Sequence, residues 1–454
     1  MRAGEWITRG ATLLRPSLEP RAMAAGAAAG TVSPRSTRER LGATLRRHQE
    51  ALSPRALRRT LSELQAIVDP RASEVEGSRR AHDFAQWYAK AGTAERRDCW
   101  LLMSEQFSPD PDVLKSAREQ YEKSLGTAEE LHAEVHMRRA FQTPRTRMLQ
   151  RFAGAPDGMR FLVDLRAELL PQLKSERRLL PLDADLEHLF STWFDVAFLE
   201  LRRISWDSPA SLVEKLIKYE AVHDIRSWAD VKNRLDSDRR CYGFFHPSLD
   251  GEPLIFVEVA LVDEISASIE PLLDESAEPA DLLRATTAIF YSISNTQAGL
   301  RGVSFGDSLI KRVVETLKEE FPRLRTFATL SPIPGLRQWM AKNAPADLLA
   351  ALSDPLALGP KSPHRQQLLA HAARYLGQEL ENGKPCDPVA RFHLGNGARV
   401  ERLNWAADPS PKGLKQSFGL MVNYLYDLKR LDRHRTLLAQ GQIPMSRAIE
   451  DLYG

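Results

Sequence analysis

The segment from residue 285 to residue 330 constrains the fold more than any other part of the 454-residue chain. It opens with a run rich in β-branched and aromatic residues, ATTAIFYSIS, and continues into a turn with two glycines, RGVSFGD. An amphipathic helix that Pro322 closes comes next, followed by a second strand, RTFATL; the buried face of the helix is expected to consist of Leu309, Ile310, Val313, Val314 and Leu317. This order predicts a right-handed βαβ crossover whose two strands are parallel.

The neighbouring segments add strands of the opposite sense. FLELRRISW (198–206) predicts a strand and SLVEKLIKYEAVH (211–223) a helix, while RRCYGFFHP and PLIFVEVALV form a hairpin around SLDGEP. Nearer the C-terminus, VARFHL (389–394) and RVERLNW (399–405) are expected to be strands joined by an Asn-Gly turn. Together these segments predict a mixed α/β sheet domain over residues 191–454.

Residues 37–190 have helical periodicity instead. In SPRALRRTLSELQAIVD, Ser53 is a candidate cap, Pro54 suits the first helical position, and Leu57, Leu61, Leu64 and Val68 form one apolar stripe. Since no catalytic cluster is evident there, we expect a helical bundle that serves assembly into a homo-oligomer. The fold class is therefore α+β with two domains: an all-α bundle followed by the sheet domain.

Composition excludes several functions. The chain has 63 basic and 60 acidic residues, a net charge of +3, so a dedicated nucleic-acid binder is not indicated. Its three cysteines, Cys99, Cys241 and Cys386, show neither disulfide nor zinc spacing, and no apolar run approaches the roughly 20 residues that cross a bilayer. We expect neither a metal site nor a membrane partner.

The Arg-rich residues 1–36 predict a disordered leader, which is either an organelle transit peptide or sequence that precedes a true start at Met23. We expect a cytoplasmic protein and leave a mitochondrial location open. The C-terminal DLYG is not a peroxisomal signal.

The glycine turn suits an anion. Gly302 and Gly306 let the backbone approach a ligand, and the amides that lead into the helix N-terminus favour a pyrophosphate. Lys311 and Arg312 either assist or are simply solvated. RGVSFGDSLI resembles the Arg-Gly-x-Gly-x-Gly-x-x-Leu-Leu pattern of the N-acetyltransferase superfamily, with Ser304 in place of the middle glycine, and this resemblance implies coenzyme A as the ligand.

Two further residues are expected beside the turn. Ser331 in SPIPG follows the second parallel strand, and ligands of open α/β sheets sit at the carboxyl ends of such strands. His393 lies 62 residues downstream and could complete an acid/base pair with Ser331.

Several blocks resemble the malonyl-CoA decarboxylase family: HPSLDGEPL, AIFYSISNTQAGLRGVSFG, TLSPIPG, FHLGNGARVERLNWAAD and GLMVNYLY. The resemblance implies a helical domain joined to an acetyltransferase-like fold, with a catalytic serine at Ser331, a catalytic histidine at His393 and a supporting tyrosine at Tyr426. It places coenzyme binding on Arg301, Gly302, Val303, Ser304, Phe305, Gly306 and Asp307, together with Ser331 and His393. Animal members carry a supporting glutamate where this chain has Ser304.

The implied reaction converts malonyl-CoA to acetyl-CoA and CO₂, a step in fatty acid metabolism. The thioester itself can hold the charge left by CO₂ as an enolate, so no metal or organic cofactor is expected. We expect His393 to deliver the proton; alternatively, His393 only polarises the carbonyl and water supplies the proton. A CoA-dependent acyltransferase and a non-catalytic acyl-CoA-binding protein remain the alternative functions.

Overall fold

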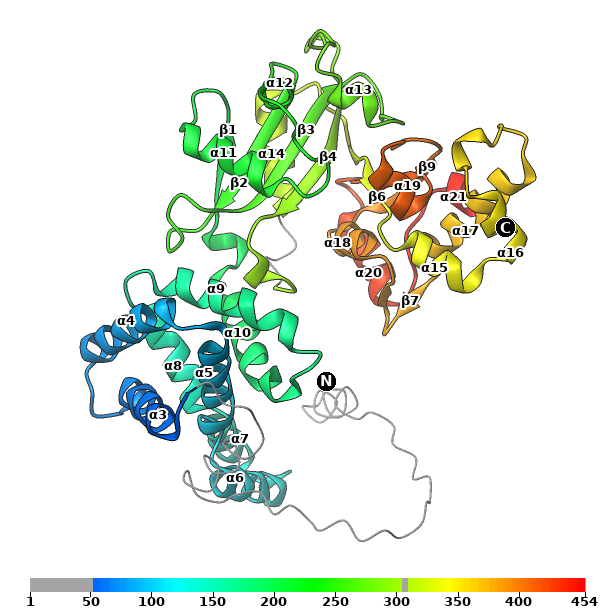
Figure 1. The fold of residues 1–454 in the computed structure, drawn as a ribbon. Coiled ribbons are helices and arrows are strands. Elements are labelled where there is room, and N and C mark those ends of the chain that lie inside the picture. Colours follow the sequence, from blue (N-terminus) through cyan, green and yellow to red (C-terminus); the bar gives the residue numbers. More distant parts are fainter. Residues whose placement is uncertain (1–51, 304–308, 454) are drawn as a thin grey trace. The chain divides into compact units, whose positions relative to one another are not determined.

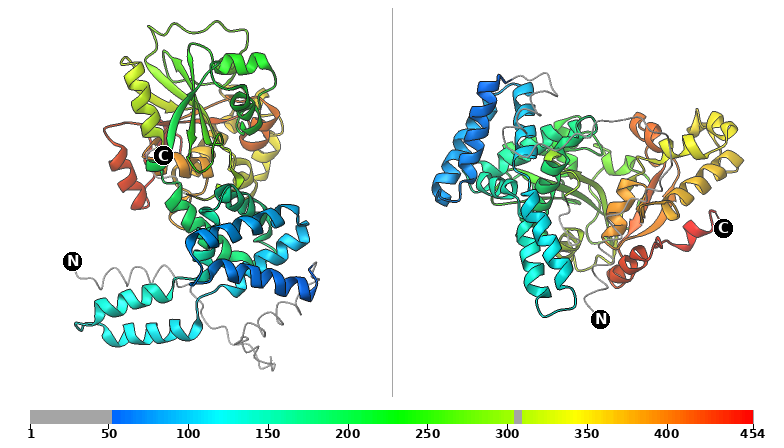
Figure 2. Two further views of the ribbon diagram at one scale, coloured as in Figure 1. Left: turned by 90° about the vertical axis from the view of Figure 1, so that its left-hand side faces the viewer. Right: turned by 90° about the horizontal axis from the view of Figure 1, so that it is seen from below.

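The computed structural model describes residues 52–303 and 309–453. The expected leader, residues 1–36, lies outside the described residues. The described part of the chain begins with a helical region. Its α-helices are α3 (Pro54–Val68), α4 (Glu74–Lys90), α5 (Thr93–Gln106), α6 (Pro111–Ser124), α7 (Glu130–Ala140), α8 (Pro144–Ala153), α9 (Gly158–Leu169) and α10 (Leu180–Trp193). Figure 2 shows α6 and α7 side by side as an antiparallel pair.

The predicted start of α3 is confirmed. Ser53 caps the helix by accepting a hydrogen bond from the Ala56 amide at 3.2 Å, and Pro54 occupies the first turn. Leu57, Leu61 and Leu64 are buried as expected, whereas Val68 is only partly buried because Ile67 lies nearer the core. The apolar stripe therefore covers the core side of the helix.

A mixed sheet follows the helices, in the strand order β1-β2-β3-β4-β5-β10-β6, with β9 paired to β10. Its strands are β1 (Glu200–Ile204), β2 (Arg239–Phe245), β3 (Pro253–Val262), β4 (Thr287–Asn295), β5 (Thr326–Thr329), β6 (Ser331–Pro332), β9 (Arg399–Asn404) and β10 (Met421–Leu425). The pair β4 and β5 is parallel and the other pairs are antiparallel. The predicted fold class is confirmed.

The βαβ unit has the predicted parallel strands. Helix α14 (Leu309–Glu320) connects β4 to β5, which pair from Thr287↔Thr326 to Phe290↔Thr329. All five apolar residues predicted for its inner face are buried. Figure 1 shows α14 against the sheet, between the labels of β1 and β3.

β4 extends beyond the end of its parallel partner, β5. Beyond Phe290 the strand remains paired with β3 as far as Asn295↔Ile255, but in the described part of the chain no strand pairs with its other edge there. The register of β3 and β4 also shifts at Glu258, so that Tyr291 is skipped in the pairing. Alternate backbone groups between Tyr291 and Asn295 therefore have no strand partner on the β5 side among the described residues.

The remaining elements are mostly helices. They are α11 (Ala210–Tyr219), α12 (Trp228–Arg234), α13 (Glu270–Leu273), α15 (Leu336–Asn343), α16 (Ala346–Ala351), α17 (Pro363–Gly377), β7 (Leu380–Glu381), β8 (Lys384–Pro385), α18 (Pro388–Gly395), α19 (Pro411–Ser417), α20 (Leu431–Ala439) and α21 (Arg447–Glu450). Figure 1 shows the helices that follow β5 gathered around β6 and β9.

One predicted strand is wrong: VARFHL, which carries His393, is helix α18. Asp387 caps this helix by accepting hydrogen bonds from the amides of Val389 and Ala390, and Pro388 occupies its first turn. A capping aspartate followed by proline starts a helix, and this local signal outweighs the β-prone residues that follow it. The strand predicted after the Asn-Gly turn is present as β9.

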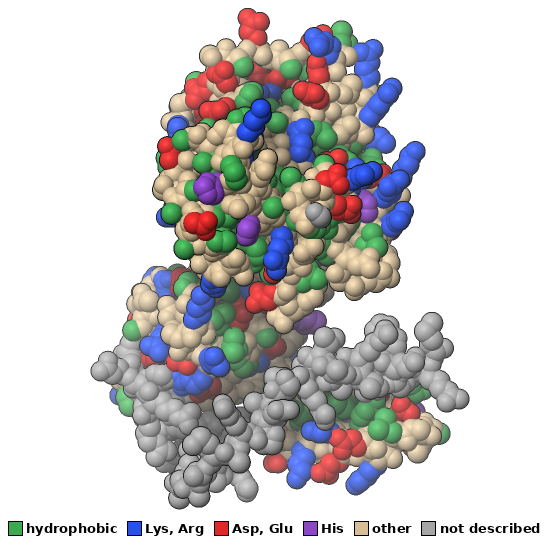
Figure 3. All heavy atoms as spheres, turned by 90° about the vertical axis from the view of Figure 1, so that its right-hand side faces the viewer, with side chains coloured by type: hydrophobic (Ala, Val, Ile, Leu, Met, Phe, Trp, Pro, Cys, Tyr) green, Lys and Arg blue, Asp and Glu red, His purple; other side chains and the backbone are tan. Residues whose placement is uncertain are grey.

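The charges on the surface are mixed. Figure 3 shows lysine and arginine side chains interspersed with acidic ones over the face that it draws, as the small net charge leads one to expect. Over residues 52–303 and 309–453, no helix has the length and apolarity that a bilayer crossing requires.

Candidate active site

Ser331, His393 and Tyr426 form one hydrogen-bonded row. Ser331 Oγ lies 3.2 Å from His393 Nε2, and His393 Nδ1 lies 2.7 Å from the Tyr426 hydroxyl. The three residues come from different parts of the chain: Ser331 from β6, His393 from α18, and Tyr426 from the position after β10. β10 pairs with β6 at Ser331↔Val422, and the Tyr426 amide donates to the Phe327 carbonyl of β5, so Ser331 and Tyr426 lie along the same part of the sheet.

A fourth residue, Thr329, sets the direction of the hydrogen bonds. Ser331 Oγ donates to Thr329 Oγ1 at 2.8 Å, so it accepts the hydrogen of His393. The imidazole proton is then on Nε2, and Nδ1 accepts from the Tyr426 hydroxyl. Thr329 Oγ1 is itself held by the Tyr424 amide at 3.1 Å. The row thus runs from Tyr426 through His393 and Ser331 to Thr329.

The row is buried. Ser331, His393 and Tyr426 expose 5%, 3% and 3% of their surface, so little solvent competes for these hydrogen bonds. Burial lowers the pKa of His393 to about 3 and raises the pKa of the Tyr426 hydroxyl well above its ordinary value. At neutral pH, therefore, the imidazole is uncharged and the phenol keeps its proton. The Tyr424 ring stacks on the imidazole, with ring centroids 4.7 Å apart.

The glycine turn is described in part. Gly302 has φ = 83°, a left-handed conformation that favours glycine, and Arg301 is exposed beside it. Ser304, Phe305, Gly306 and Asp307 lie outside the described residues, and so does the comparison of Ser304 with the family's glutamate.

The two basic residues after the turn have structural contacts. Arg312 Nη1 donates to the carbonyls of Val196 and Leu199 at 2.9 and 2.6 Å, which ties α14 to the start of the sheet domain. Lys311 is exposed and lies 3.8 Å from Glu315. Arg312 is thus already engaged with the fold, and Lys311 remains solvated.

A cavity of about 480 Å³ adjoins the turn. Its walls come from residues 295–303 without Gly299, from the start of α14, and from one face of α18; the α18 side contributes Arg391, Phe392, Gly395 and Asn396. Asn396 is 9% exposed, and its Oδ1 has no hydrogen-bond partner among the described residues. Because His393 is on the same helix, α18 joins the cavity to the hydrogen-bonded row.

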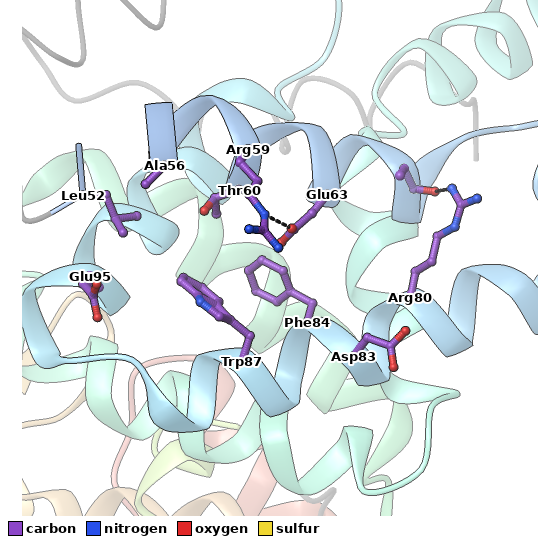
Figure 4. A pocket seen from close by; sticks show the side chains of 11 residues that line it. Leu52, Ala56, Arg59, Thr60, Glu63, Arg80, Asp83, Phe84, Trp87 and Glu95 are labelled. Atoms are coloured by element: carbon purple, nitrogen blue, oxygen red, sulfur yellow. Dashed lines mark hydrogen bonds and ion pairs between the residues drawn. The ribbon is translucent and has the colours of Figure 1, made fainter. Parts of the chain in front are cut away.

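Another cavity, of about 620 Å³, lies between α3 and α4. Figure 4 shows Phe84 and Trp87 reaching from α4 toward α3, with Arg59 and Glu63 paired above them. None of the predicted site residues lines this cavity. In the segments that the structure describes, no three His, Cys, Asp or Glu side chains are grouped as a metal ion requires.

Comparisons with known proteins match both the helical region and the sheet region to one family. The family described as the malonyl-CoA decarboxylase C-terminal domain matches residues 197–453, and the corresponding N-terminal domain matches residues 107–194. The chain belongs to the malonyl-CoA decarboxylase family. The mitochondrial malonyl-CoA decarboxylase of Anser anser anser is 35% identical over 458 residues, which cover 89% of this chain and 88% of that protein. The mouse protein of the same name is 40% identical over 338 residues, or 66% of this chain and 68% of its own.

Solved structures of malonyl-CoA decarboxylases resemble the whole fold. The one from Rhodopseudomonas palustris has a TM-score of 0.78 at 41% identity, and the match covers 87% of this chain and 99% of that structure. The one from Agrobacterium vitis has a TM-score of 0.79 at 40% identity, with 87% and 100% covered. The resemblance stated from the sequence is therefore confirmed at the level of family and fold.

Two further polar residues, Thr329 and Asp387, contact the hydrogen-bonded row or the segments that carry it. Thr329 lies two positions before Ser331, on the same side of an extended chain, and this spacing could have signalled their contact. Asp387 Oδ2 accepts a hydrogen bond from the Gly335 amide at 3.2 Å, while its Oδ1 caps α18. Asp387 therefore links the SPIPG segment to the helix that carries His393. The Asp-Pro pair was a readable helix-start signal.

Proposed function

We propose that the chain decarboxylates malonyl-CoA to acetyl-CoA and CO₂, with Ser331, His393 and Tyr426 as its catalytic row. The observation that carries the proposal is the buried, directional hydrogen-bonded row, whose His393 is on α18, the helix that also lines the cavity at the glycine turn. Family membership supports the same activity, because the relatives are named malonyl-CoA decarboxylases.

The coenzyme would bind at the cavity beside the turn. Arg301 and Arg391 are exposed, line this cavity and make no ion pair within residues 52–303 and 309–453, so both can meet the phosphates. Arg391 Nε and Nη2 donate to the Pro385 carbonyl, which fixes the guanidinium in place. The open edge of β4, from Tyr291 to Asn295, can hydrogen-bond the amides of a pantetheine arm that lies along it.

Loss of CO₂ breaks the bond between the carboxylate carbon and the α-carbon. The electron pair passes into the thioester as an enolate, so the anionic carboxylate leaves as a neutral molecule. A charged imidazole would stabilise that carboxylate before reaction and slow its departure, whereas the neutral His393 of a buried site does not. The lowered pKa of His393 therefore suits this step.

Protonation of the enolate carbon completes the reaction. His393 carries its proton on Nε2, toward Ser331, and delivers it to the carbon either directly or through the Ser331 hydroxyl. Loss of this proton leaves negative charge on the imidazole ring, and the Tyr426 hydroxyl, which donates to Nδ1, stabilises that charge. Solvent then returns one proton, so the net reaction consumes a proton and releases CO₂.

Three expectations extend this proposal. The reaction needs no metal or organic cofactor, because the thioester accepts the electron pair. The helical region assembles the chain into a homo-oligomer, for which exposed apolar side chains such as Leu131 and Phe141 are suitable contacts. The cytoplasm is the expected compartment, and the Arg-rich start of the chain keeps a mitochondrial one as the alternative.

The test is the release of CO₂ and acetyl-CoA from malonyl-CoA in the presence of EDTA. Wild type should turn over, and Ser331→Ala and His393→Ala should bind coenzyme A but lose about 10²-fold or more in kcat, the usual cost of removing a proton-transfer group. Ser104→Ala is a matched control, because Ser104 is also buried and hydrogen-bonded, to the carbonyl of Arg178 in the helical region.

The alternatives give different results. A wild type that binds malonyl-CoA and releases no CO₂ would contradict the decarboxylase and leave an acyl-CoA-binding protein. An acyltransferase would release coenzyme A only when an acceptor amine is added.

A further inference from the structure

Helix α9 of the helical region contacts the segment that leads into the glycine turn. This segment is itself a turn and comprises Gln297, the short 3-10 helix Ala298–Leu300 and Arg301. Gly299 packs so closely on α9 that an added Cβ would lie 1.9 Å from the Val163 carbonyl oxygen. Only glycine fits between the two backbones, so the turn and α9 meet without an intervening side chain.

Arg166 fixes the backbone of this turn. The residue is 1% exposed, and its Nη1 donates to the carbonyls of Gly299 and Arg301 at 2.8 and 2.9 Å. Asp183, on α10, accepts from Nε at 2.8 Å and balances the buried charge. The guanidinium thus holds two carbonyls of the turn against two helices of the helical region.

Arg160 fixes the side chain that begins the turn. Its Nη1 donates to Gln297 Oε1 at 2.7 Å. The Gln297 amide in turn donates to the Pro253 carbonyl at 3.0 Å and to Thr296 Oγ1 at 2.9 Å. Gln297 is 5% exposed, so it is a buried link between α9 and the start of β3.

Neither arginine lines the cavity proposed for the coenzyme, whereas the turn they hold does. Gln297, Ala298, Leu300, Arg301 and Gly302 form one wall of that cavity. Any effect of Arg160 or Arg166 on the coenzyme must therefore act through the position of the wall.

We propose that Arg160 and Arg166 are positioning residues that pre-order the coenzyme-binding turn, so that the helical region is a structural part of the coenzyme site. The inference rests on the proposed function, because it takes the cavity to bind coenzyme A. A turn that is already ordered loses little conformational freedom on binding, so its release from α9 weakens binding. The row of Ser331, His393 and Tyr426 is held by other elements, so the chemical step keeps its rate.

The test compares Arg160→Ala with Asp164→Ala. Both substitutions remove the ion pair between these residues on the outer side of α9, but only Arg160→Ala removes the hydrogen bond to Gln297. We expect Arg160→Ala to raise the Kd for coenzyme A and the KM for malonyl-CoA about tenfold, with kcat within about twofold of wild type. Asp164→Ala should match wild type in all three constants.

A second pair of variants covers the buried arginine. Arg166→Met is compared with Arg151→Met, because Arg151 is also buried in the helical region and donates to backbone carbonyls, those of Ile67 and Ala72, away from the turn. Both variants should lower the Tm, and only Arg166→Met should also raise the Kd. A purely structural role would give equal losses of Tm with no change in Kd.

The outcomes separate the two proposals. If wild type binds coenzyme A and Arg160→Ala binds it equally well, the positioning inference is overturned and the proposed function stands. If wild type neither binds coenzyme A nor releases CO₂, the proposed function is overturned and this inference with it.

Discussion

His393 differs from an ordinary histidine because burial lowers its pKa to about 3. A free imidazole titrates near pH 6.5, so a solvated histidine would carry charge for part of the range in which proteins work. Here the proton on Nε2 stays in place from mildly acidic to alkaline pH, because Ser331 accepts it and Tyr426 donates to Nδ1. In the proposed reaction, such a residue gives a proton to the enolate without placing a positive charge beside the malonyl carboxylate.

The protonation state can be measured directly. Because the pKa is lowered, His393 takes up a second proton only as the pH falls toward 3, and no titration is expected near pH 6.5. Protein with ¹⁵N-labelled histidine, with the His393 signal assigned from its loss in His393→Gln, should show a neutral Nε2–H ring from pH 5 to pH 8. A signal that shifts with a midpoint near pH 6.5, or that reports the Nδ1–H form, would contradict both the burial argument and the direction of the row.

At the scale of elements, α18 carries His393 and depends on one carboxylate. Asp387 caps its first turn with Oδ1 and binds the Gly335 amide with Oδ2, and it is 1% exposed. Burial raises the pKa of Asp387, although the backbone amides it accepts from oppose the shift. The same side chain thus sets where α18 begins and where the segment after Ser331 lies.

Asp387→Ala should therefore affect stability and catalysis together. We expect the free energy of unfolding to fall by about 1–2 kcal/mol, the usual cost of a lost cap with an amide left unpaired, and kcat to fall because His393 and Ser331 are no longer held together. Urea unfolding and steady-state kinetics measure the two effects. Asp387→Asn keeps one capping oxygen but places an NH₂ group where Oδ2 accepts from Gly335, so it should retain most of the stability and lose part of kcat.

Loss of a distant cap provides the comparison. Ser53→Ala removes the cap of α3 and should cost about 1 kcal/mol with kcat unchanged. If Asp387→Ala loses stability but keeps its full kcat, Asp387 caps the helix and does not position the row.

These elements also show how far the sequence predicts the fold. The βαβ unit, the hairpin of β2 and β3 and the stripe of α3 follow from local periodicity and turn residues, and all are present. VARFHL was misassigned because its alternation resembles a strand, while the stronger signal, Asp387-Pro388, stands just before it. No elements were predicted between Gly335 and Pro385, where the structure has α15, α16 and the 15-residue α17; the prolines and glycines between these helices interrupt the helical periodicity.

The candidate residues could be named from the sequence, whereas their geometry could not. Ser331 and His393 are expected from topology and from the family resemblance, Tyr426 from the resemblance alone, and no spacing in the chain shows that the three form one row. Their contact depends on β6 pairing with β10 about 90 residues later, and long-range register of this kind is set by the whole core. The sequence gives no sign of the role of Thr329, because threonine is common in strands and only its hydrogen bond to Ser331 sets it apart.

At the scale of the whole molecule, a buried charge cluster joins the helices and strands that begin the sheet domain. Arg234 of α12 is fully buried and donates to Glu258 of β3 at 2.8 Å and to Asp230 at 2.6 Å. Glu220, after α11, accepts from Ser292 and Ser294 of β4 close by. Burial, together with the charge of Glu220, raises the pKa of Glu258 to about 7 even though Arg234 lowers it.

Arg234→Met should destabilise the fold in a pH-dependent way. At pH 8 we expect a loss of about 3–5 kcal/mol, since Glu258 and Asp230 lose their buried partner. Without Arg234 the pKa of Glu258 rises further, so the native variant holds a proton that the unfolded chain releases above about pH 4.5. Its stability therefore falls as the pH rises, and the loss relative to wild type should be smaller at pH 5.5 than at pH 8.

Urea unfolding of both proteins at the two pH values measures this difference. Arg118→Ala serves as the control, because it breaks an exposed pair with Glu122 and should cost less than about 1 kcal/mol at either pH. A loss in Arg234→Met that is equal at the two pH values, or larger at pH 5.5, would show that Glu258 does not take up the proton. The cluster would then be held by packing of α12 on the sheet rather than by its charges, and removal of Arg234 would act through the cavity it leaves.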